Sequence, residues 1–262
     1  MGMDDAYANA AHIENAQSFP STWARESTAF RDQLGGHAKL DLTYGEARRE
    51  RFDLFLPEGK SAGLFVFVHG GYWKAFDKNT WSHLAGGAIG NNWAVAMPSY
   101  TLAPEARIST MTRQVARSVS AAARLVDGPI VLAGHSAGGH LVARMLDPQV
   151  LPRRVADRLT HVMPISPLSD LRPLLRTSMN EDLQLDDAEA EAESPMLMQD
   201  RYATDVTVWV GSDERPAFLD QARWLADAWS AKLVVTEGKH HFDVIAPLAD
   251  KDSPMIRALL QP

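Results

Sequence analysis

Cysteine is absent from this chain of 262 residues. Its absence excludes disulfides, catalytic thiolates and cysteine-ligated metals, and it agrees with a reducing cytoplasm. Long apolar runs are also absent, since no stretch reaches the roughly 18 apolar residues of a membrane span. The polar, acidic opening MGMDDAYANA lacks the basic and then apolar pattern of a signal peptide. We therefore expect a cytoplasmic protein without a membrane partner.

Positive charge is outnumbered by negative charge. The chain has 26 Lys and Arg against 33 Asp and Glu, a formal net charge of −7, and no basic run offsets it. This balance disfavours nucleic acid as a partner. There is no HExxH motif and no dinucleotide fingerprint, and His135 and His140 are poorly spaced for two ligands on one helix face. We expect no metal, no cofactor and a small-molecule substrate, and we leave a homodimer open.

The hydrophobic pattern predicts an α/β fold. Hydrophobic residues make up 45% and charged residues 23% of the chain, which is typical of one globular domain of this length. The runs LFVFV, IVLA and VTVWV are almost wholly apolar, as in parallel strands covered on both faces. We predict one domain over residues 1–262, doubly wound, with a mostly parallel eight-stranded sheet, helices on both faces and a ligand crevice at the carboxyl ends of the strands. The expected strands are residues 37–43, 51–56, 64–68, 94–97, 130–133, 161–165, 206–210 and 233–236, and the expected helices are residues 79–90, 108–126, 137–146, 216–231 and 253–260.

Residues 169–203 interrupt the alternation of strands and helices. They contain LRPLLR, the acidic run DDAEAEAES, and the pair Met196 and Met198. We predict a small helical insertion that caps the active site. The alternative is an acidic, solvated helix without a role, because charged runs usually face water.

Ser136 is the strongest candidate for a catalytic residue. It lies in the pentapeptide GHSAG, directly after the apolar strand IVLA and before a helical stretch. This is the context of a nucleophile elbow, in which a strained turn exposes a serine. Small residues are needed two positions before and after that serine, and Gly134 and Gly138 supply them. The alternative is a serine that caps a helix after a glycine-rich turn.

A serine nucleophile needs a general base and an acid that orients it, and in this fold the acid precedes the histidine along the chain. His161, His240 and His241 lie far enough downstream. His161 enters a strand and is expected to be structural. We favour His241 over His240, since it directly precedes Phe242 and an apolar helical start.

The acid is expected on the loop after the penultimate strand, where GSDERPAF offers Asp213 and Glu214. Composition does not choose between them, because neighbouring loop residues point in different directions. The usual offset of three residues from Gly211 favours Glu214. Asp213 remains the second candidate.

The motif HGGYW follows the strand LFVFV and predicts an oxyanion hole. A tetrahedral intermediate needs backbone donors, and glycines let the chain approach the substrate closely. We expect donors around Gly70 and Gly71, together with the N–H of Ala137 directly after the nucleophile.

Several motifs together resemble the kynurenine formamidase (arylformamidase) family, close to the hormone-sensitive-lipase-like esterases. In chain order they are LTYGEARRERFDLFLP, HGGYW, PSYTLAPEARI, GHSAGGH, ERPAFLDQA and HHFDVI, and they span most of the chain. The resemblance implies an α/β-hydrolase fold, with Ser136 as nucleophile, His241 as base and Glu214 as acid. It also implies hydrolysis of N-formyl-L-kynurenine to kynurenine and formate, in tryptophan breakdown.

Side chains of matching chemistry are available for such a substrate. Tyr72 and Trp73 adjoin the oxyanion glycines, and Trp73 would stack on an aromatic ring unless it belongs to the core. Arg172, Arg176 or Arg201 in or near the insertion would pair with an amino-acid carboxylate unless solvated.

Two other functions remain open for the same residues. A broad-specificity carboxylesterase for small acyl esters would share every catalytic residue and differ only in its pocket walls. A ligand-binding relative without catalysis would have lost its triad, which the presence of a serine, an acid and a histidine disfavours.

Overall fold

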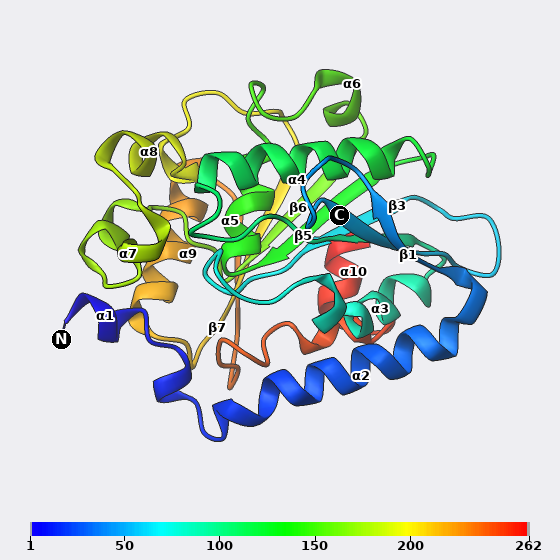
Figure 1. Cartoon of the computed structure of the whole chain (residues 1–262), viewed down its shortest axis with the longest axis horizontal. Coiled ribbons are helices and arrows are strands. Elements are labelled where there is room, and N and C mark those ends of the chain that lie inside the picture. The colour runs from blue at the N-terminus through cyan, green and yellow to red at the C-terminus, as the bar shows by residue number, and fades with distance from the viewer. Residues whose placement is uncertain (1, 261–262) are drawn as a thin grey trace.

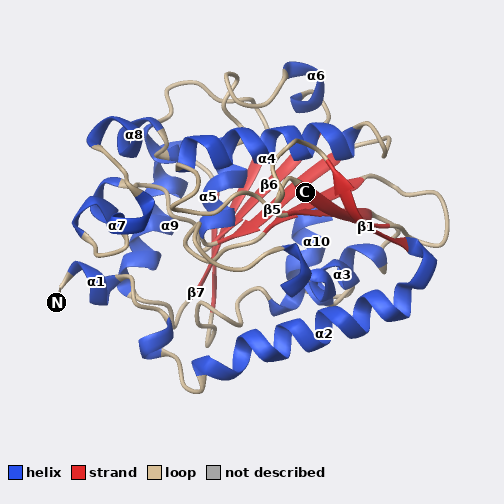
Figure 2. Ribbon diagram, viewed as in Figure 1, coloured by secondary structure: helices blue, strands red, loops and turns tan. Residues whose placement is uncertain are grey.

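The computed structural model describes residues 2–260 and has a single eight-stranded sheet at its centre (Figures 1 and 2). The strand order is β1-β2-β4-β3-β5-β6-β7-β8; β2 is antiparallel to both of its neighbours, and the other pairs are parallel. The bounds are β1 Ala38–Thr43, β2 Arg51–Phe55, β3 Leu64–Val68, β4 Ala94–Pro98, β5 Ile130–His135, β6 Leu159–Ile165, β7 Asp205–Gly211 and β8 Lys232–Thr236. The predicted fold class is confirmed.

Helices cover both faces of the sheet, each over its own apolar core (Figure 2). One face carries α4 (Ile108–Ala123), α5 (Ala137–Arg144) and α9 (Pro216–Trp229), and the other carries α2 (Phe19–Leu34), α3 (Gly86–Ile89) and α10 (Pro254–Leu260). Alternate residues of a strand pack in opposite cores. Val66 of β3 packs in the core under α4, α5 and α9, and Phe65 packs in the core under α2, α3 and α10. This alternation follows from the two-residue period of a strand.

One predicted helix differs from the structure, and one long helix was not predicted. Residues 79–90 were expected to form one helix, but they form two short 3₁₀ turns, Lys78–Thr80 and Ser82–Ala85, followed by the one-turn helix α3. A glycine pair weakens a continuous helix here, and Gly87 is needed because an added Cβ would lie 2.4 Å from the Leu248 carbonyl oxygen. The sixteen-residue helix α2 was not predicted at all.

Residues 169–203 contain only short helical pieces: 3₁₀ turns at Arg172–Arg176 and Pro195–Leu197, α7 at Asn180–Leu183 and α8 at Asp187–Ala192. The acidic run does not simply face water. Glu189 accepts a 2.6 Å hydrogen bond from Arg107, and the buried Glu193 accepts one of 2.7 Å from Thr112 and one of 3.2 Å from Arg144. These carboxylates fix the segment to α4 and α5.

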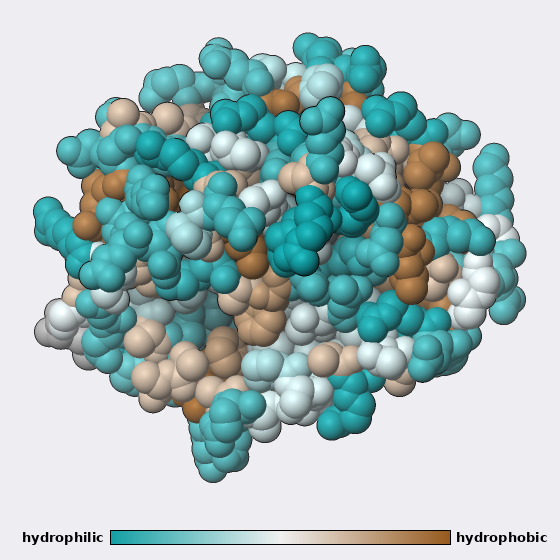
Figure 3. Space-filling view, viewed as in Figure 1, coloured by the Kyte–Doolittle hydropathy of each residue, from teal (hydrophilic) through white to brown (hydrophobic). Residues whose placement is uncertain are grey.

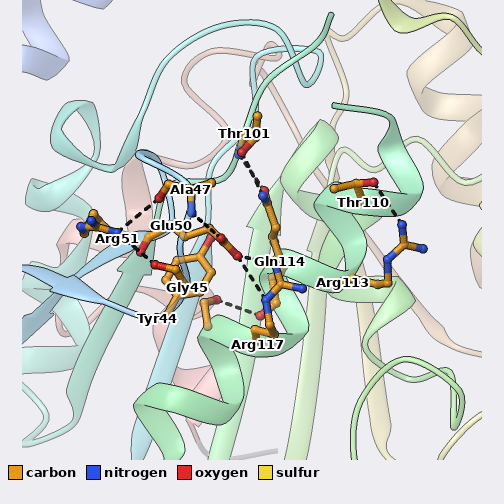
Figure 4. Close-up of polar contacts among 12 residues, drawn as sticks. Tyr44, Gly45, Ala47, Glu50, Arg51, Thr101, Thr110, Arg113, Gln114 and Arg117 are labelled. Carbon is orange, nitrogen blue, oxygen red and sulfur yellow. Dashed lines mark hydrogen bonds and ion pairs between the residues drawn. The ribbon is translucent and has the colours of Figure 1, made fainter. Parts of the chain in front are cut away.

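A polar network joins the loop after β1 to α4 (Figure 4). The buried carboxylate of Glu50 accepts hydrogen bonds from Ala47 N–H and from Arg117 of α4. Nearer the start of α4, Gln114 accepts a 2.8 Å hydrogen bond from Thr101 N–H and donates one of 2.9 Å to the Thr101 hydroxyl. The loop after β4 is thereby tied to α4, and the Tyr100 hydroxyl of the same loop donates a 3.0 Å hydrogen bond to the carbonyl of His69, just after β3.

The face of the molecule in Figure 3 is mainly hydrophilic, with apolar residues in scattered patches. Among the residues that the structure describes, the large exposed hydrophobic side chains are Leu40, Leu125, Trp224 and Val235. No helix within residues 2–260 is long and apolar enough to cross a membrane.

Candidate active site

Ser136 occupies the sharp turn between β5 and α5. Its backbone has φ 58° and ψ −118°, a region that residues other than glycine avoid because of steric cost. The turn leaves no room for side chains on either side: an added Cβ at Gly138 would lie 1.9 Å from the Val68 carbonyl oxygen, and one at Gly134 would lie 2.2 Å from that of Gly138. This is the geometry of a nucleophile elbow.

His241 and Glu214 meet beside this turn. His241 lies on the loop after β8 and Glu214 on the loop after β7, and both side chains are buried. Nδ1 of His241 is 2.5 Å from Oε2 of Glu214. The other carboxylate oxygen, Oε1, accepts hydrogen bonds from Gly211 N–H at 2.9 Å and from the Ser166 hydroxyl at 2.5 Å. Sequence reasoning had not identified Ser166.

The neighbouring candidates have other partners. Asp213 is exposed, and its carboxylate accepts a hydrogen bond from the Ser212 hydroxyl at 2.8 Å. Nδ1 of His240 accepts a 3.1 Å hydrogen bond from the backbone of Phe242, which stabilises the turn. The geometry therefore brings together Glu214 and His241 rather than Asp213 and His240.

Two rings hold the imidazole of His241. The ring centroid of Phe218 is 4.3 Å away, and that of His135 is 4.6 Å away. Burial lowers the pKa of His135 well below its usual value, and the nearby His241 adds to this effect. His135 is therefore neutral at physiological pH and packs against His241 without adding a charge.

The other histidines near the sheet ends are also buried. Burial lowers the pKa of His69 to about 4 and that of His140 to about 3. His161 lies within β6, where its Nε2 is 3.0 Å from the Thr207 hydroxyl, as expected of a structural residue. Within residues 2–260, no group of three or more His, Asp or Glu side chains is arranged to hold a metal ion.

The HGGYW loop passes directly beside Ser136. An added Cβ at Gly70 would lie 2.7 Å from the His135 carbonyl oxygen and 3.0 Å from Cβ of Ser136, so only glycine permits this approach. The next residues, Gly71 and Tyr72, have φ values of 105° and 50°, which turn the chain back on itself. Within the described residues, the N–H groups of Gly70, Gly71 and Tyr72 have no hydrogen-bond acceptor.

Ala137 is the first residue of α5. Its N–H is among the first four of the helix, which have no acceptor inside it. The start of α5 lies against the HGGYW loop, because an added Cβ at Gly138 would lie 2.6 Å from the His69 carbonyl oxygen.

The two aromatic residues of the motif have different positions. Tyr72 lines the cavity described below, and its hydroxyl donates a 2.5 Å hydrogen bond to the Tyr7 carbonyl. Trp73 has no exposed surface and packs edge-on against His140, with ring centroids 5.2 Å apart. The expectation that Trp73 stacks on a substrate is therefore wrong, because its φ of 56° turns the chain and the ring is in the core.

A cavity of about 610 Å³ opens onto Ser136 and His241. Its walls are largely aromatic and apolar, and include Trp23, Phe76, Trp81, Met179 and Phe242. The N-terminal residues 4 and 7–11 also line it, whereas residues 169–203 contribute only Ser178 and Met179. Figure 1 shows α1 (Met3–Ala6) beside α7, and Asp4 accepts a 2.7 Å hydrogen bond from Ser178 N–H. The cover over the cavity is therefore shared, with the larger part from the N-terminal segment.

The charged groups of the cavity differ from those predicted. Its described lining includes Lys74 and Asp4, and Lys74 forms an ion pair with Asp182. The three expected arginines lie elsewhere: Arg172 pairs with Asp170, Arg176 is exposed, and Arg201 donates to the Trp229 carbonyl. None of them is part of the cavity lining. Lys74 directly follows HGGYW in the sequence, which was the available signal for it.

Residues 65–239 match the model of a family described as having the alpha/beta hydrolase fold. Kynurenine formamidase from Danio rerio is 30% identical over 236 residues, which cover 85% of this chain and 80% of the relative. Kynurenine formamidase from Drosophila melanogaster is 31% identical over 241 residues, covering 83% and 79%.

Solved structures give the same architecture. A candidate thioesterase from Silicibacter sp. TM1040 is 62% identical, with a TM-score of 0.98 and 99% of each chain covered. An esterase from Pyrobaculum calidifontis is 17% identical, with a TM-score of 0.69 and coverage of 88% of this chain and 86% of its own. At that identity, the likeness to the esterase concerns the fold alone.

Proposed function

Because the chain belongs to the kynurenine formamidase family of α/β hydrolases and is a hydrolase, we propose that its reaction is the hydrolysis of N-formyl-L-kynurenine to L-kynurenine and formate. The observation that carries the proposal is the position of Ser136 and His241 in the wall of an aromatic cavity. An anilide-type formamide needs both a nucleophile and a flat apolar surface for its ring.

The first half of the reaction forms a formyl-enzyme on Ser136. The Oγ atom attacks the formyl carbon, while His241 takes the hydroxyl proton through Nε2 and Glu214 holds the imidazolium through Nδ1–H. The negative charge moves to the formyl oxygen. Backbone N–H groups of Gly71, Tyr72 and Ala137 stabilise it. The C–N bond then breaks, and the departing aryl amine takes the proton from His241.

The second half releases formate. A water molecule gives a proton to His241 and attacks the formyl ester, and the same N–H groups stabilise the second oxyanion. When the intermediate collapses, the proton returns from His241 to Oγ of Ser136. In this scheme Gly70, whose own N–H also has no acceptor within the described residues, permits close approach of the loop, and the N–H groups of the next two residues are the donors.

The charges of the cavity suit the amino-acid end of the proposed substrate. Lys74 is a cation for the carboxylate, and Asp4 is an anion for the ammonium group. Trp23 and Phe242 add apolar rings to the cavity wall for the aryl part of the substrate.

A second candidate function is hydrolysis of esters or thioesters. It is favoured by the candidate thioesterase that is 62% identical to this chain. The same acyl transfer would operate, since a thiolate or alkoxide replaces the amine as leaving group. A coenzyme A thioester fits less well, because Lys74 is the one Lys or Arg in the described lining and three phosphate groups need more cations.

Steady-state kinetics on three substrates distinguish these functions. We expect the largest kcat/KM with N-formyl-L-kynurenine, smaller values with p-nitrophenyl acetate and acetyl-coenzyme A, and no turnover of any of them by Ser136→Ala. A larger kcat/KM for either ester would replace formamide hydrolysis as the function. Unchanged turnover by Ser136→Ala would remove the mechanism.

A further inference from the structure

Ser166 lies directly after β6 and contacts the acid of the proposed triad. It is fully buried, and its hydroxyl donates to Oε1 of Glu214 at 2.5 Å. Gly211 N–H donates to the same oxygen at 2.9 Å. The other oxygen, Oε2, is 2.5 Å from Nδ1 of His241. The two oxygens of one carboxylate thus have separate partners.

The backbone of Ser166 is held in a costly conformation. Its φ is 47°, which is sterically unfavourable for any residue with a Cβ. Its N–H donates to the Trp209 carbonyl at 2.7 Å, which fixes this conformation. Glycine would adopt the same backbone without steric cost, so the hydroxyl is what a serine adds at this position.

The same end of β6 also supports the nucleophile. The carbonyl of Ile165, the residue before Ser166, accepts a 2.8 Å hydrogen bond from the N–H of Ser136. Consecutive residues therefore contact the backbone of Ser136 and the side chain of Glu214. This arrangement fixes the separation between the two.

Resting on the proposed function, we propose that Ser166 is a positioning residue whose hydroxyl sets the rotation of the Glu214 carboxylate. With Oε1 held by two donors, Oε2 is directed at His241. Without the hydroxyl, the carboxylate turns about its last side-chain bond and its alignment with the imidazole is less well defined. Since Ser166 is not part of the cavity lining, its effect falls on kcat and not on substrate binding.

Two substitutions test this role against a matched control. Ser166→Ala removes the hydroxyl and keeps the Cβ, while Ser166→Gly removes both and relieves the backbone strain. Ser118→Ala is the control, because Ser118 is also buried but donates only to the Val115 carbonyl within α4. We expect kcat for N-formyl-L-kynurenine to fall roughly 10- to 100-fold in both Ser166 variants, by analogy with the loss when a hydrogen-bond partner that orients a metal ligand is removed, with KM within about twofold. Ser118→Ala retains wild-type kinetics.

Two further readouts do not depend on the natural substrate. The rate at which a fluorophosphonate labels Ser136 should fall in both Ser166 variants. The downfield proton resonance of the His241–Glu214 hydrogen bond should shift or broaden in both, and remain unchanged in Ser118→Ala. Wild-type kcat and labelling rates in folded Ser166 variants would overturn the proposal. If the wild type is labelled but does not hydrolyse the formamide, the substrate assignment fails, and the labelling rates still decide the role of Ser166.

Discussion

Oε2 of Glu214 is 2.5 Å from Nδ1 of His241, whereas the adjacent Asp213 is exposed and bonded to Ser212. A carboxylate buried against an imidazole fixes the tautomer in which Nε2 is free to accept a proton. The contact with His241 therefore distinguishes Glu214 from Asp213, which the residue types alone do not.

The first prediction concerns this pair of acids. Glu214→Gln keeps the shape of the side chain but removes the charge that stabilises the imidazolium, so kcat should fall by about 10³- to 10⁴-fold. Asp213→Asn is the matched control and should change kcat by less than about twofold. Kinetics with N-formyl-L-kynurenine measure both. A greater loss in Asp213→Asn would assign the acid to Asp213.

The second prediction concerns the elbow. Gly138→Ala would place a Cβ 1.9 Å from the Val68 carbonyl oxygen, a backbone atom that cannot move away without shifting β3. We expect loss of stability of about 4 kcal/mol or more, seen as a large drop in the thermal midpoint or as failure to fold. Gly36→Ala is the control, because nothing lies within 4 Å of its added Cβ. A Gly138→Ala protein with the wild-type midpoint would contradict the described packing.

The third prediction concerns acid stability. Burial lowers the pKa of His69 to about 4 and that of His140 to about 3, so both stay neutral in the folded chain while the unfolded chain takes up protons near pH 6.5. The contribution of these two histidines to stability is therefore complete only above about pH 7, and it is lost as the pH falls through 6.5 toward their lowered pKa values. Each histidine should reduce the free energy of unfolding by roughly 1.4 kcal/mol per pH unit below pH 6.

Denaturant unfolding between pH 8 and pH 5 measures this dependence. The curve should be nearly flat from pH 8 to pH 7 and fall steeply below pH 6. A free energy of unfolding that does not change down to pH 5 would show that these histidines are protonated in the folded chain.

The sheet and the elbow could be predicted because their signals are local. Apolar runs such as LFVFV indicate buried parallel strands. The glycines two positions before and after Ser136 meet a steric requirement of the turn, which can be read from five consecutive residues. The sheet has all eight predicted strands, with ends within two residues of those expected. Local pattern and tertiary structure agree here.

The remaining features depend on tertiary contacts. Trp73 was expected at the substrate, but the positive φ values along the HGGYW loop turn its ring into the core, and no residue pattern indicates such a turn. Helix α2 was missed because Trp23 and Ser27 are the only residues it fully buries, so its apolar periodicity is weak. The N-terminal cover of the cavity was missed because residues 4–11 are mostly Ala, Asp and Asn and have no apolar periodicity. Their role follows from where Tyr7 and Asn9 are held.

The last prediction concerns recognition of the substrate's carboxylate. Lys74 lies in the cavity lining and follows the loop that carries the proposed oxyanion donors, while its partner Asp182 is partly exposed. Lys74→Met keeps the length and apolar stem of the side chain but removes the charge. The KM for N-formyl-L-kynurenine should rise about tenfold, the equivalent of about 1.4 kcal/mol for one charged contact. The same substitution should leave p-nitrophenyl acetate kinetics unchanged, because that ester has no carboxylate.

Lys60→Met, at an exposed position outside the cavity lining, is the control. An equal loss for both substrates would mean that Lys74 supports the loop and does not recognise the amino-acid end, whereas a loss confined to the formamide would assign that end of the cavity to the amino-acid group.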